Sequence, residues 1–369
     1  MRRAVIISPT FNEAGNIEKL IPLIFKQAEN LPNWEIHLLV VDSKSPDKTG
    51  DIVEKLISKY PRLRLLRVEK EGLGKAYTQG FRIVIEKLSP YLIFEIDADL
   101  SHDPREIPNF IRQIEKGADL VIGSRYIKGG SSPKEWALHR KIFSFFGNLI
   151  VRFGFMKLNI SDWTSGYRAI KTWVVKSTLN HVKDYSGYVF QIALLNDSII
   201  RGAKIKEIPI RFEDRKIGKS KINSTQYIVN IIAYIFFHSA FIKFAIVGLI
   251  GFIIDFGISY VFIEKFRSAV WLGTLISTEI AIISNFLLNN FWSFSYKKLE
   301  HKLSSYLANF LKFNIVSSGS ILLQTLGVQL AVNFFGRQLW YVYKIIIIFF
   351  IVIPYSYILY NKFIWKERN

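Results

Sequence analysis

Hydrophobic and polar positions follow two different patterns along the 369-residue chain. In its first part, short apolar runs of strand length alternate with longer stretches of helical period. The runs that predict strands are 4–8, 36–42, 63–68, 91–97, 120–123 and 205–212. The stretches that predict helices are 13–29, 47–59, 73–87, 104–116 and 136–153. Strands and helices that alternate in this way favour a mostly parallel sheet with helices on both faces.

Beyond residue 240 the apolar runs become long enough to cross a lipid bilayer. Four such runs lie at about 241–263, 270–294, 310–333 and 341–361. A helix of about 20 residues spans the ~30 Å hydrocarbon core. A large buried helical bundle is the alternative, but runs such as 343–360 have no polar face. We therefore expect a soluble α/β domain over 1–223 and an all-α transmembrane domain of four helices over 241–369.

The stretch 224–240, between these domains, is rich in Ile, Tyr and Phe and has few charges. A helix of this composition favours the surface of a membrane, so we expect an interfacial amphipathic helix here. The alternative is a soluble helix that packs in a core.

Basic residues lie mainly on one side of the predicted spans. They occur around the loop between the second and third spans and in the C-terminal tail: Lys297, Lys298, Lys302, Lys312, Lys362, Lys366 and Arg368. The turns on the other side carry Lys265, Arg267 and Arg337. By the positive-inside rule, the first domain, this loop and the C-terminus lie in the cytosol. The chain is thus expected to be a multi-pass protein of the cell membrane.

The composition narrows the choice of partner. The net charge is +19, from 49 Lys and Arg against 30 Asp and Glu, and there is no Cys, which excludes disulfides and thiolate chemistry. The positive excess favours nucleic acid, lipid head groups or a phosphorylated substrate. Nucleic acid is disfavoured because the aromatic residues lie in apolar runs and not beside the basic ones.

Three of the predicted strands end in polar residues. The first runs into 8–13, the second into 42–47 and the fourth into 97–99. Helix capping explains any one of these ends, but it does not explain all three together. Because the carboxyl ends of parallel strands meet at one edge of a sheet, we expect a ligand site there.

Asp97 and Asp99 are separated by one residue at the end of a strand. Two carboxylates so close repel each other unless a cation lies between them. Hard oxygen ligands favour Mg²⁺ or Mn²⁺, and such an ion would bridge a diphosphate and neutralise a nucleoside diphosphate as it leaves.

These motifs resemble glycosyltransferase family 2, which has the GT-A fold, a Rossmann-like and mostly parallel sheet. The resemblance rests on Pro9-Thr-Phe-Asn-Glu, Val40-Val-Asp, Asp97-Ala-Asp and Gly123-Ser-Arg-Tyr. Further motifs resemble dolichol-phosphate mannose synthases and related bacterial polyprenyl-phosphate glycosyltransferases: Trp136-Ala-Leu-His-Arg-Lys, Asp162-Trp-Thr-Ser-Gly-Tyr-Arg, Gly187-Tyr-Val-Phe-Gln and Pro209-Ile-Arg-Phe. The resemblance covers about residues 1–225, and the membrane part is similar to the GtrA-like four-span domain.

The resemblance implies roles for individual residues. Donor-nucleotide binding falls to Pro9, Phe11, Glu13, Asp42, Asp97, Ala98, Arg215 and Lys221. Metal binding falls to Asp97, Asp99 and Ser101, and binding of the acceptor phosphate to Arg125, Arg140 and Ser144, with Asp99, Arg125 and Arg140 as the catalytic set. The chain departs from the family pattern at Ser43, Ser101 and Ala193.

The implied reaction is transfer of a hexose, with inversion, to the phosphate of a polyprenyl or dolichyl phosphate at the cytosolic face. Mannose from GDP-mannose is favoured, and glucose from UDP-glucose is the alternative. A different class of function is movement of a glycolipid across the membrane by the spans. A processive polysaccharide synthase is disfavoured because the chain lacks a Gln-x-x-Arg-Trp motif. Self-association of the chain stays open.

Overall fold

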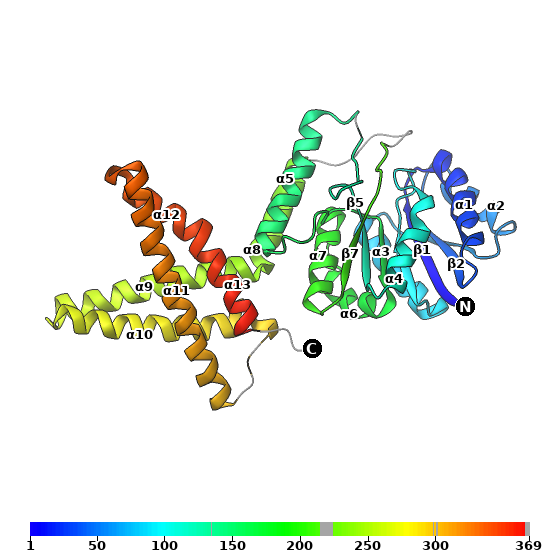
Figure 1. Cartoon of the computed structure of the whole chain (residues 1–369). Helices are drawn as coiled ribbons and strands as arrows, with labels where there is room; N and C mark the ends of the chain where they lie inside the picture. Colours follow the sequence, from blue (N-terminus) through cyan, green and yellow to red (C-terminus); the bar gives the residue numbers. More distant parts are fainter. Residues whose placement is uncertain (134, 215–223, 298, 300–301, 366–369) are drawn as a thin grey trace. The chain divides into compact units, whose positions relative to one another are not determined.

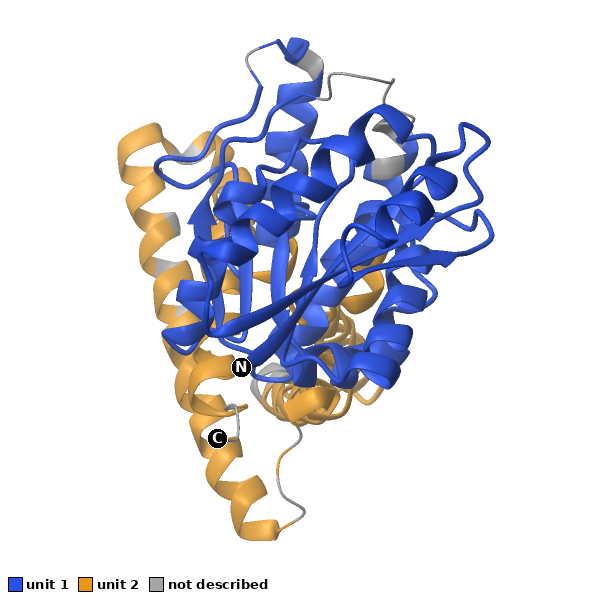
Figure 2. Cartoon of the chain, turned by 90° about the vertical axis from the view of Figure 1, so that its right-hand side faces the viewer, with its two compact units in different colours: residues 1–153, 157–232 blue, residues 154–156, 233–369 orange. Residues whose placement is uncertain are grey.

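The computed structural model describes residues 1–133, 135–214, 224–297, 299 and 302–365. The chain forms two compact units (Figure 2). The first comprises residues 1–153 and 157–232, and the second comprises 154–156 and 233–369. The limits predicted for the soluble domain, the interfacial helix and the membrane domain stay predictions.

A seven-stranded sheet forms the centre of the first unit, with the strand order β3-β2-β1-β4-β6-β5-β7 (Figure 1). The strands are β1 (Arg2–Thr10), β2 (Trp34–Asp42), β3 (Leu63–Arg67), β4 (Leu92–Glu95), β5 (Leu120–Ser124), β6 (Arg168–Lys171) and β7 (Ile205–Pro209). Neighbouring strands run parallel except where β6 pairs antiparallel with both β4 and β5. The predicted mostly parallel sheet is confirmed.

Helices cover both faces of this sheet. They are α1 (Ala14–Glu29), α2 (Thr49–Ile57), α3 (Leu73–Leu88), α4 (Ile107–Glu115, after the short η1, Pro104–Glu106), α6 (Thr172–Val182) and α7 (Gly187–Ile200). A further helix of this unit, α5 (Leu138–Phe155), extends away from the sheet (Figure 1). α1, α2 and α4 share one buried apolar cluster with alternate strand residues such as Ile6 and Phe94. On the other face, Gly80 of α3 lets the helix approach so closely that a Cβ there would lie 3.0 Å from Ile7 Cγ2.

The sequence pattern did not predict β6, α6 or α7. β6 has four residues, which is too few for a period of two to be recognised. α7 is buried along most of its length, so it has no polar face to mark its helical period.

The second unit is helical. Its elements are α9 (Ala240–Tyr260), η2 (Val261–Lys265), α10 (Val270–Leu288), η3 (Asn289–Ser293), η4 (Ser295–Lys297), α11 (Leu303–Phe335), η5 (Arg337–Leu339), α12 (Trp340–Ile347), η6 (Ile348–Val352) and α13 (Ile353–Phe363). α8 (Ser224–His238) lies across the division between the units.

Among the described residues, three helical stretches are long and apolar enough to cross a membrane: Ala240–Lys265, Leu303–Phe335 and Ile345–Phe363. They correspond to the first, third and fourth predicted spans. The second, 270–294, corresponds to α10 and η3 and stays a prediction.

Asn290 connects three parts of the second unit. Its side chain is fully buried, and its Oδ1 accepts hydrogen bonds from the Leu299 backbone N–H and from Trp365 Nε1, both at 3.1 Å. Its Nδ2 donates to the Tyr306 hydroxyl at 3.1 Å. Trp365 in turn stacks on Phe294 with ring centroids 4.5 Å apart. One amide thus links η3, the start of α11 and the chain beyond α13.

We predict that Asn290→Ala destabilises this unit, because each buried donor left unpaired costs about 1–3 kcal/mol. The apparent thermal unfolding midpoint of the full chain in detergent measures the effect. Asn333→Ala is the control, since Asn333 is exposed and accepts a local hydrogen bond from Gln329 on the same helix. Equal shifts in the two variants would contradict the role given to Asn290.

Candidate active site

The polar strand ends meet at one edge of the sheet. β2, β1 and β4 are neighbours and parallel, so their carboxyl ends lie side by side as predicted. The buried Asp42 carboxylate accepts hydrogen bonds from Thr10 Oγ1 at 3.0 Å and from Ser45 Oγ at 2.5 Å. Asp42 therefore ties the loop after β2 to the end of β1, where a nucleoside would bind.

The other predicted nucleotide residues lie around this edge. Glu13 accepts a hydrogen bond from Asn16 at 2.7 Å, and the Lys70 ammonium lies 3.6 Å from the centroid of the Phe11 ring. Pro9 is in β1, and Ala98 is buried between the two aspartates. Arg215 and Lys221 lie outside the described residues, so their predicted contact with the donor diphosphate is not tested.

Asp97 and Asp99 differ in exposure. The Asp97 side chain is 35% exposed, whereas Asp99 is buried and its Oδ1 accepts from Ser101 Oγ at 2.6 Å and from the Ser101 N–H at 3.0 Å. Ser101 thus orients Asp99, and its role as a metal ligand stays a prediction.

The donor set at Asp97 and Asp99 suits a hard divalent cation that takes its remaining ligands from elsewhere. Among the described residues, no group of three or more His, Cys, Asp or Glu side chains could hold a metal ion. Mg²⁺ is commonly bound by one or two carboxylates together with substrate phosphates and water. The two aspartates fit this pattern, with diphosphate oxygens to complete the shell.

His102 is a buried residue that forms a hydrogen bond with the backbone of Asp97. Its Nδ1 accepts from the Asp97 backbone N–H at 3.1 Å, and its Nε2 lies 3.9 Å from Asp97 Oδ2. Burial lowers the pKa of His102 to about 4, although the nearby Asp99 charge acts in the opposite direction. The ring is therefore neutral at pH 7 and carries its proton on Nε2, toward Asp97. The sequence analysis assigned metal binding to Asp97, Asp99 and Ser101 in this segment and gave no role to His102.

Arg125 forms a buried ion pair with Asp162. Its Nε and Nη2 donate to the two Asp162 carboxylate oxygens at 2.8 Å each, and Nη2 also donates to Thr164 Oγ1 at 2.8 Å. Burial alone would raise the pKa of Asp162, but the charge and hydrogen bonds of Arg125 bring it below its ordinary value. Both side chains are almost wholly buried, so the geometry favours a positioning role for Arg125, and its contact with the acceptor phosphate stays a prediction.

Arg140 and Ser144 lie one turn apart on α5. The Arg140 side chain is 35% exposed, its Nη1 lies 3.4 Å from Asp214 Oδ1, and its guanidinium lies 3.9 Å from the centre of the Trp136 ring. The Ser144 and Tyr126 hydroxyls form a hydrogen bond of 2.6 Å. Asn148 connects α5 to the loop before β6, because its Oδ1 accepts from the Trp163 N–H at 2.7 Å.

Two family models match the chain. Residues 5–180 match glycosyl transferase family 2, and residues 243–365 match the GtrA/DPMS transmembrane domain. A dolichol-phosphate mannosyltransferase of Pyrococcus furiosus is 32% identical over 332 residues, which cover 87% of this chain and 88% of the relative. The chain belongs to glycosyltransferase family 2. The resemblance inferred from its motifs is confirmed.

Two further relatives match the catalytic part. The polyprenol monophosphomannose synthase of Mycolicibacterium smegmatis is 37% identical over 61% of this chain and 82% of its own. The undecaprenyl-phosphate mannosyltransferase of Micrococcus luteus is 37% identical over 60% of this chain and 88% of its own. The chain is thus a glycosyltransferase with a membrane domain that follows its soluble catalytic domain.

A glucosyl-3-phosphoglycerate synthase from Mycobacterium tuberculosis, solved with Mn²⁺ and UDP-glucose, is a more distant structural neighbour. It has a TM-score of 0.46 and 18% identity over 64% of this chain and 78% of that structure.

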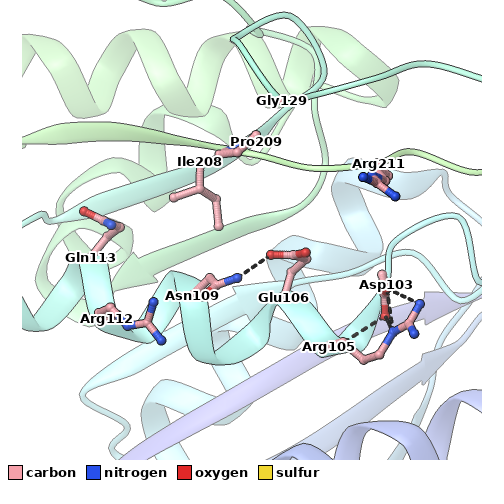
Figure 3. A pocket seen from close by; sticks show the side chains of 10 residues that line it. All are labelled: Asp103, Arg105, Glu106, Asn109, Arg112, Gln113, Gly129, Ile208, Pro209 and Arg211. Carbon is pink, nitrogen blue, oxygen red and sulfur yellow. Dashed lines mark hydrogen bonds and ion pairs between the residues drawn. The ribbon is translucent and has the colours of Figure 1, made fainter.

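This family 2 glycosyltransferase also has a groove lined by other residues of the catalytic unit (Figure 3). Its volume is about 550 Å³. Its lining residues come from η1, α4 and the region of β7, and include Arg105, Arg112 and Arg211. None of the predicted site residues lines this groove.

The sequence analysis did not identify Glu95, a buried polar residue two positions before Asp97, as part of the site. Glu95, the last residue of β4, faces Arg168 across the antiparallel pair. Arg168 is fully buried and donates to the carbonyl oxygens of Trp163, Ser165 and Gln191 at 2.7–2.9 Å. The Gln191 amide approaches the Glu95 carboxyl without a hydrogen bond of good geometry. This arrangement fixes the loop before β6 beside the end of β4, which leads into Asp97.

Burial raises the pKa of Glu95 to about 7, although the Arg168 charge and the Gln191 amide act in the opposite direction. The protonated form therefore stabilises the fold below about pH 4.5, and this stabilisation is lost as the pH rises through about 7. We predict that Glu95→Gln, which cannot ionise, gains stability relative to wild type between pH 5 and pH 8.

Apparent unfolding midpoints of the full chain at pH 5 and at pH 8 measure this gain in stability. Glu18→Gln, an exposed position on α1, is the control and should show no pH-dependent difference from wild type. A constant difference between Glu95→Gln and wild type across this range would contradict the assignment.

Proposed function

We propose that the chain transfers mannose from GDP-mannose to the phosphate of a polyprenyl phosphate at the cytosolic face of the membrane. The observation that carries the proposal is the presence in one catalytic unit of the Asp97-x-Asp99 pair and a partly exposed arginine, Arg140, on α5, a helix that Asn148 connects to the loop before β6. The three relatives, a dolichol-phosphate mannosyltransferase, a polyprenol monophosphomannose synthase and an undecaprenyl-phosphate mannosyltransferase, support the choice of substrates.

The donor diphosphate would bind between the Asp42 loop and Asp97, with Mg²⁺ or Mn²⁺ held by Asp97 and Asp99. The bound ion supplies charge neutralisation for the departing nucleoside diphosphate. Asp42 positions the nucleoside loop, Ser101 holds the Asp99 carboxylate, and His102 accepts a hydrogen bond from the Asp97 backbone N–H.

The acceptor phosphate needs no general base. A phosphate monoester has a second pKa near ~6 and is largely dianionic at pH 7. Its oxygen forms a bond to the anomeric carbon, while the bond from that carbon to the diphosphate breaks and its electron pair leaves with GDP. Attack from the side opposite the leaving group inverts the configuration. The neutral His102 is already hydrogen-bonded to Asp97, which suits a reaction without proton abstraction.

The contribution of the protein to catalysis is therefore electrostatic, because it holds two anions at reacting distance. Arg140 offsets charge on the acceptor side, and Ser144 adds a hydroxyl donor one helical turn away. The apolar transmembrane helices would hold the prenyl tail at the membrane and keep the soluble unit there.

Incubation with radiolabelled GDP-mannose or UDP-glucose and dolichyl or undecaprenyl phosphate, followed by solvent extraction, tests the proposal. Label from GDP-mannose should enter the lipid phase. Transfer only from UDP-glucose would replace the donor assignment, and no transfer from either would reject the proposal.

We predict that Asp99→Ala lowers the rate of transfer in Mg²⁺ or Mn²⁺ by at least about 100-fold, because the charge of the leaving diphosphate is no longer offset. The assay is initial rate at saturating donor and acceptor. Asp103→Ala in the same loop is the control, since Asp103 caps η1 and accepts from the Arg105 N–H. Full activity of Asp99→Ala would reject the metal assignment.

We predict that Arg140→Ala raises the KM for the acceptor by about 10- to 100-fold, the equivalent of one charge-assisted hydrogen bond. The KM for GDP-mannose should change less than twofold. Lys176→Ala, which removes an exposed charge on α6, controls for net charge. Equal losses for donor and acceptor would argue against Arg140 as an acceptor ligand.

A further inference from the structure

The guanidinium of Arg140 lies over a buried aromatic ring. Its carbon is 3.9 Å from the centroid of the Trp136 ring, well inside the range of a cation–π contact. Trp136 is 6% exposed, while the Arg140 side chain is 35% exposed. The indole is therefore a fixed surface, and the cation that lies on it is open to a ligand.

A second ring holds the indole in place. Phe212 meets Trp136 edge to face, with centroids 5.7 Å apart. The same phenyl ring lies 5.4 Å from His102 and 5.5 Å from the Arg125 guanidinium. Phe212 thus contacts the histidine that supports Asp97 as well as the indole that supports Arg140.

The chain around Phe212 is itself anchored on both sides. The Phe212 N–H donates to the Ser131 carbonyl at 3.0 Å, and the Glu213 N–H donates to the Ser101 carbonyl at 3.2 Å. Arg211, the residue before Phe212, lines the separate groove (Figure 3). This segment therefore fixes the Phe212 ring between Trp136 and the loop that contains Asp99 and Ser101.

The choice of an indole at position 136 calls for an explanation. Trp136 Nε1 is buried and has no hydrogen-bond partner among the described residues, which is unfavourable for a buried donor. An aliphatic side chain would fill apolar space without that cost. What an indole adds is the negative electrostatic face of its ring, the strongest among the aromatic side chains for holding a cation.

We propose that Trp136 is a positioning residue that holds the guanidinium of Arg140 ready for the acceptor phosphate. The inference rests on the proposed function, in which Arg140 binds that phosphate. The distance from Arg140 Nη1 to Asp214 Oδ1 is long, at 3.4 Å. The phosphate dianion replaces Asp214 as the partner of the guanidinium, which stays on the indole. Because the long Arg140 side chain is already ordered, less conformational entropy is lost when the acceptor binds.

The test compares Trp136→Leu and Trp136→Phe with wild type, with GDP-mannose and dolichyl phosphate in detergent. Trp136→Leu should raise the KM for dolichyl phosphate by about 3- to 30-fold, the range of a partly buried cation–π contact. Trp136→Phe, which keeps a weaker ring, should give a smaller rise of about 2- to 5-fold. The KM for GDP-mannose and kcat should each change less than twofold. Trp173→Leu, at a half-exposed tryptophan on α6, is the control and should change none of these values.

Arg140→Ala with and without Trp136→Leu completes a double-mutant cycle. The inference expects Trp136→Leu to have no further effect on the acceptor KM once Arg140 is absent. Independent, multiplying effects would overturn it, as would an equal rise in donor and acceptor KM for Trp136→Phe. Because Trp136→Phe keeps a ring in the buried site, it decides the question if Trp136→Leu does not fold.

The same cycle separates the inference from the proposed function. If Arg140→Ala alone leaves the acceptor KM unchanged, the acceptor role of Arg140 fails and the inference fails with it. If Arg140→Ala raises the acceptor KM and Trp136→Leu does not, only the inference fails.

Discussion

The buried ion pair between Arg125 and Asp162 is the interaction on which the rest of the catalytic unit depends. It joins the end of β5 to the loop that precedes β6, and through Thr164 and Asn148 it reaches α5. Two charges at such depth are stable only as a well-formed pair, and loss of one partner typically costs about 3–5 kcal/mol. The position of Arg140 on α5 is therefore set by a pair in which Arg140 takes no part.

Burial distinguishes the arginines of this unit by function. Arg125 and Arg168 are buried and donate to carboxylate or carbonyl oxygens of the protein. Arg140 is partly exposed and has a long contact with Asp214. A site for two phosphorylated substrates needs a cation that can change partners, and of these three only Arg140 has that freedom. Of these three arginines, Arg125 and Arg168 stabilise the structure of the unit, and Arg140 is the one that we propose binds a ligand.

Much of this could be predicted from the sequence because it depends on local pattern. The apolar runs gave six of the seven strands, and the polar ends of three of them identified the edge where the site lies. The direction and position of β6 depend on pairing with strands far away in the sequence, and four residues carry no periodic signal of it. Glu95 was hidden in an apolar run, and only the structure shows that its partner is Arg168. The predicted role of Arg125 at the acceptor phosphate stays a prediction, and its pairing with Asp162 requires tertiary contacts that no motif spacing specifies.

The place of β6 in the sheet has a consequence for how the chain is made. β6 separates β4 from β5, so β5 and β7 cannot join the first four strands until residues 168–171 have been synthesised and inserted. The sheet is complete only when β7 ends at Pro209, and the first long apolar helix begins soon afterwards at Ala240. During translation, closure of the sheet therefore comes shortly before the ribosome presents a segment that must enter the bilayer. Because domains generally fold as units from the N-terminus, the nascent chain has only a short interval in which to finish one fold before membrane insertion of the next begins.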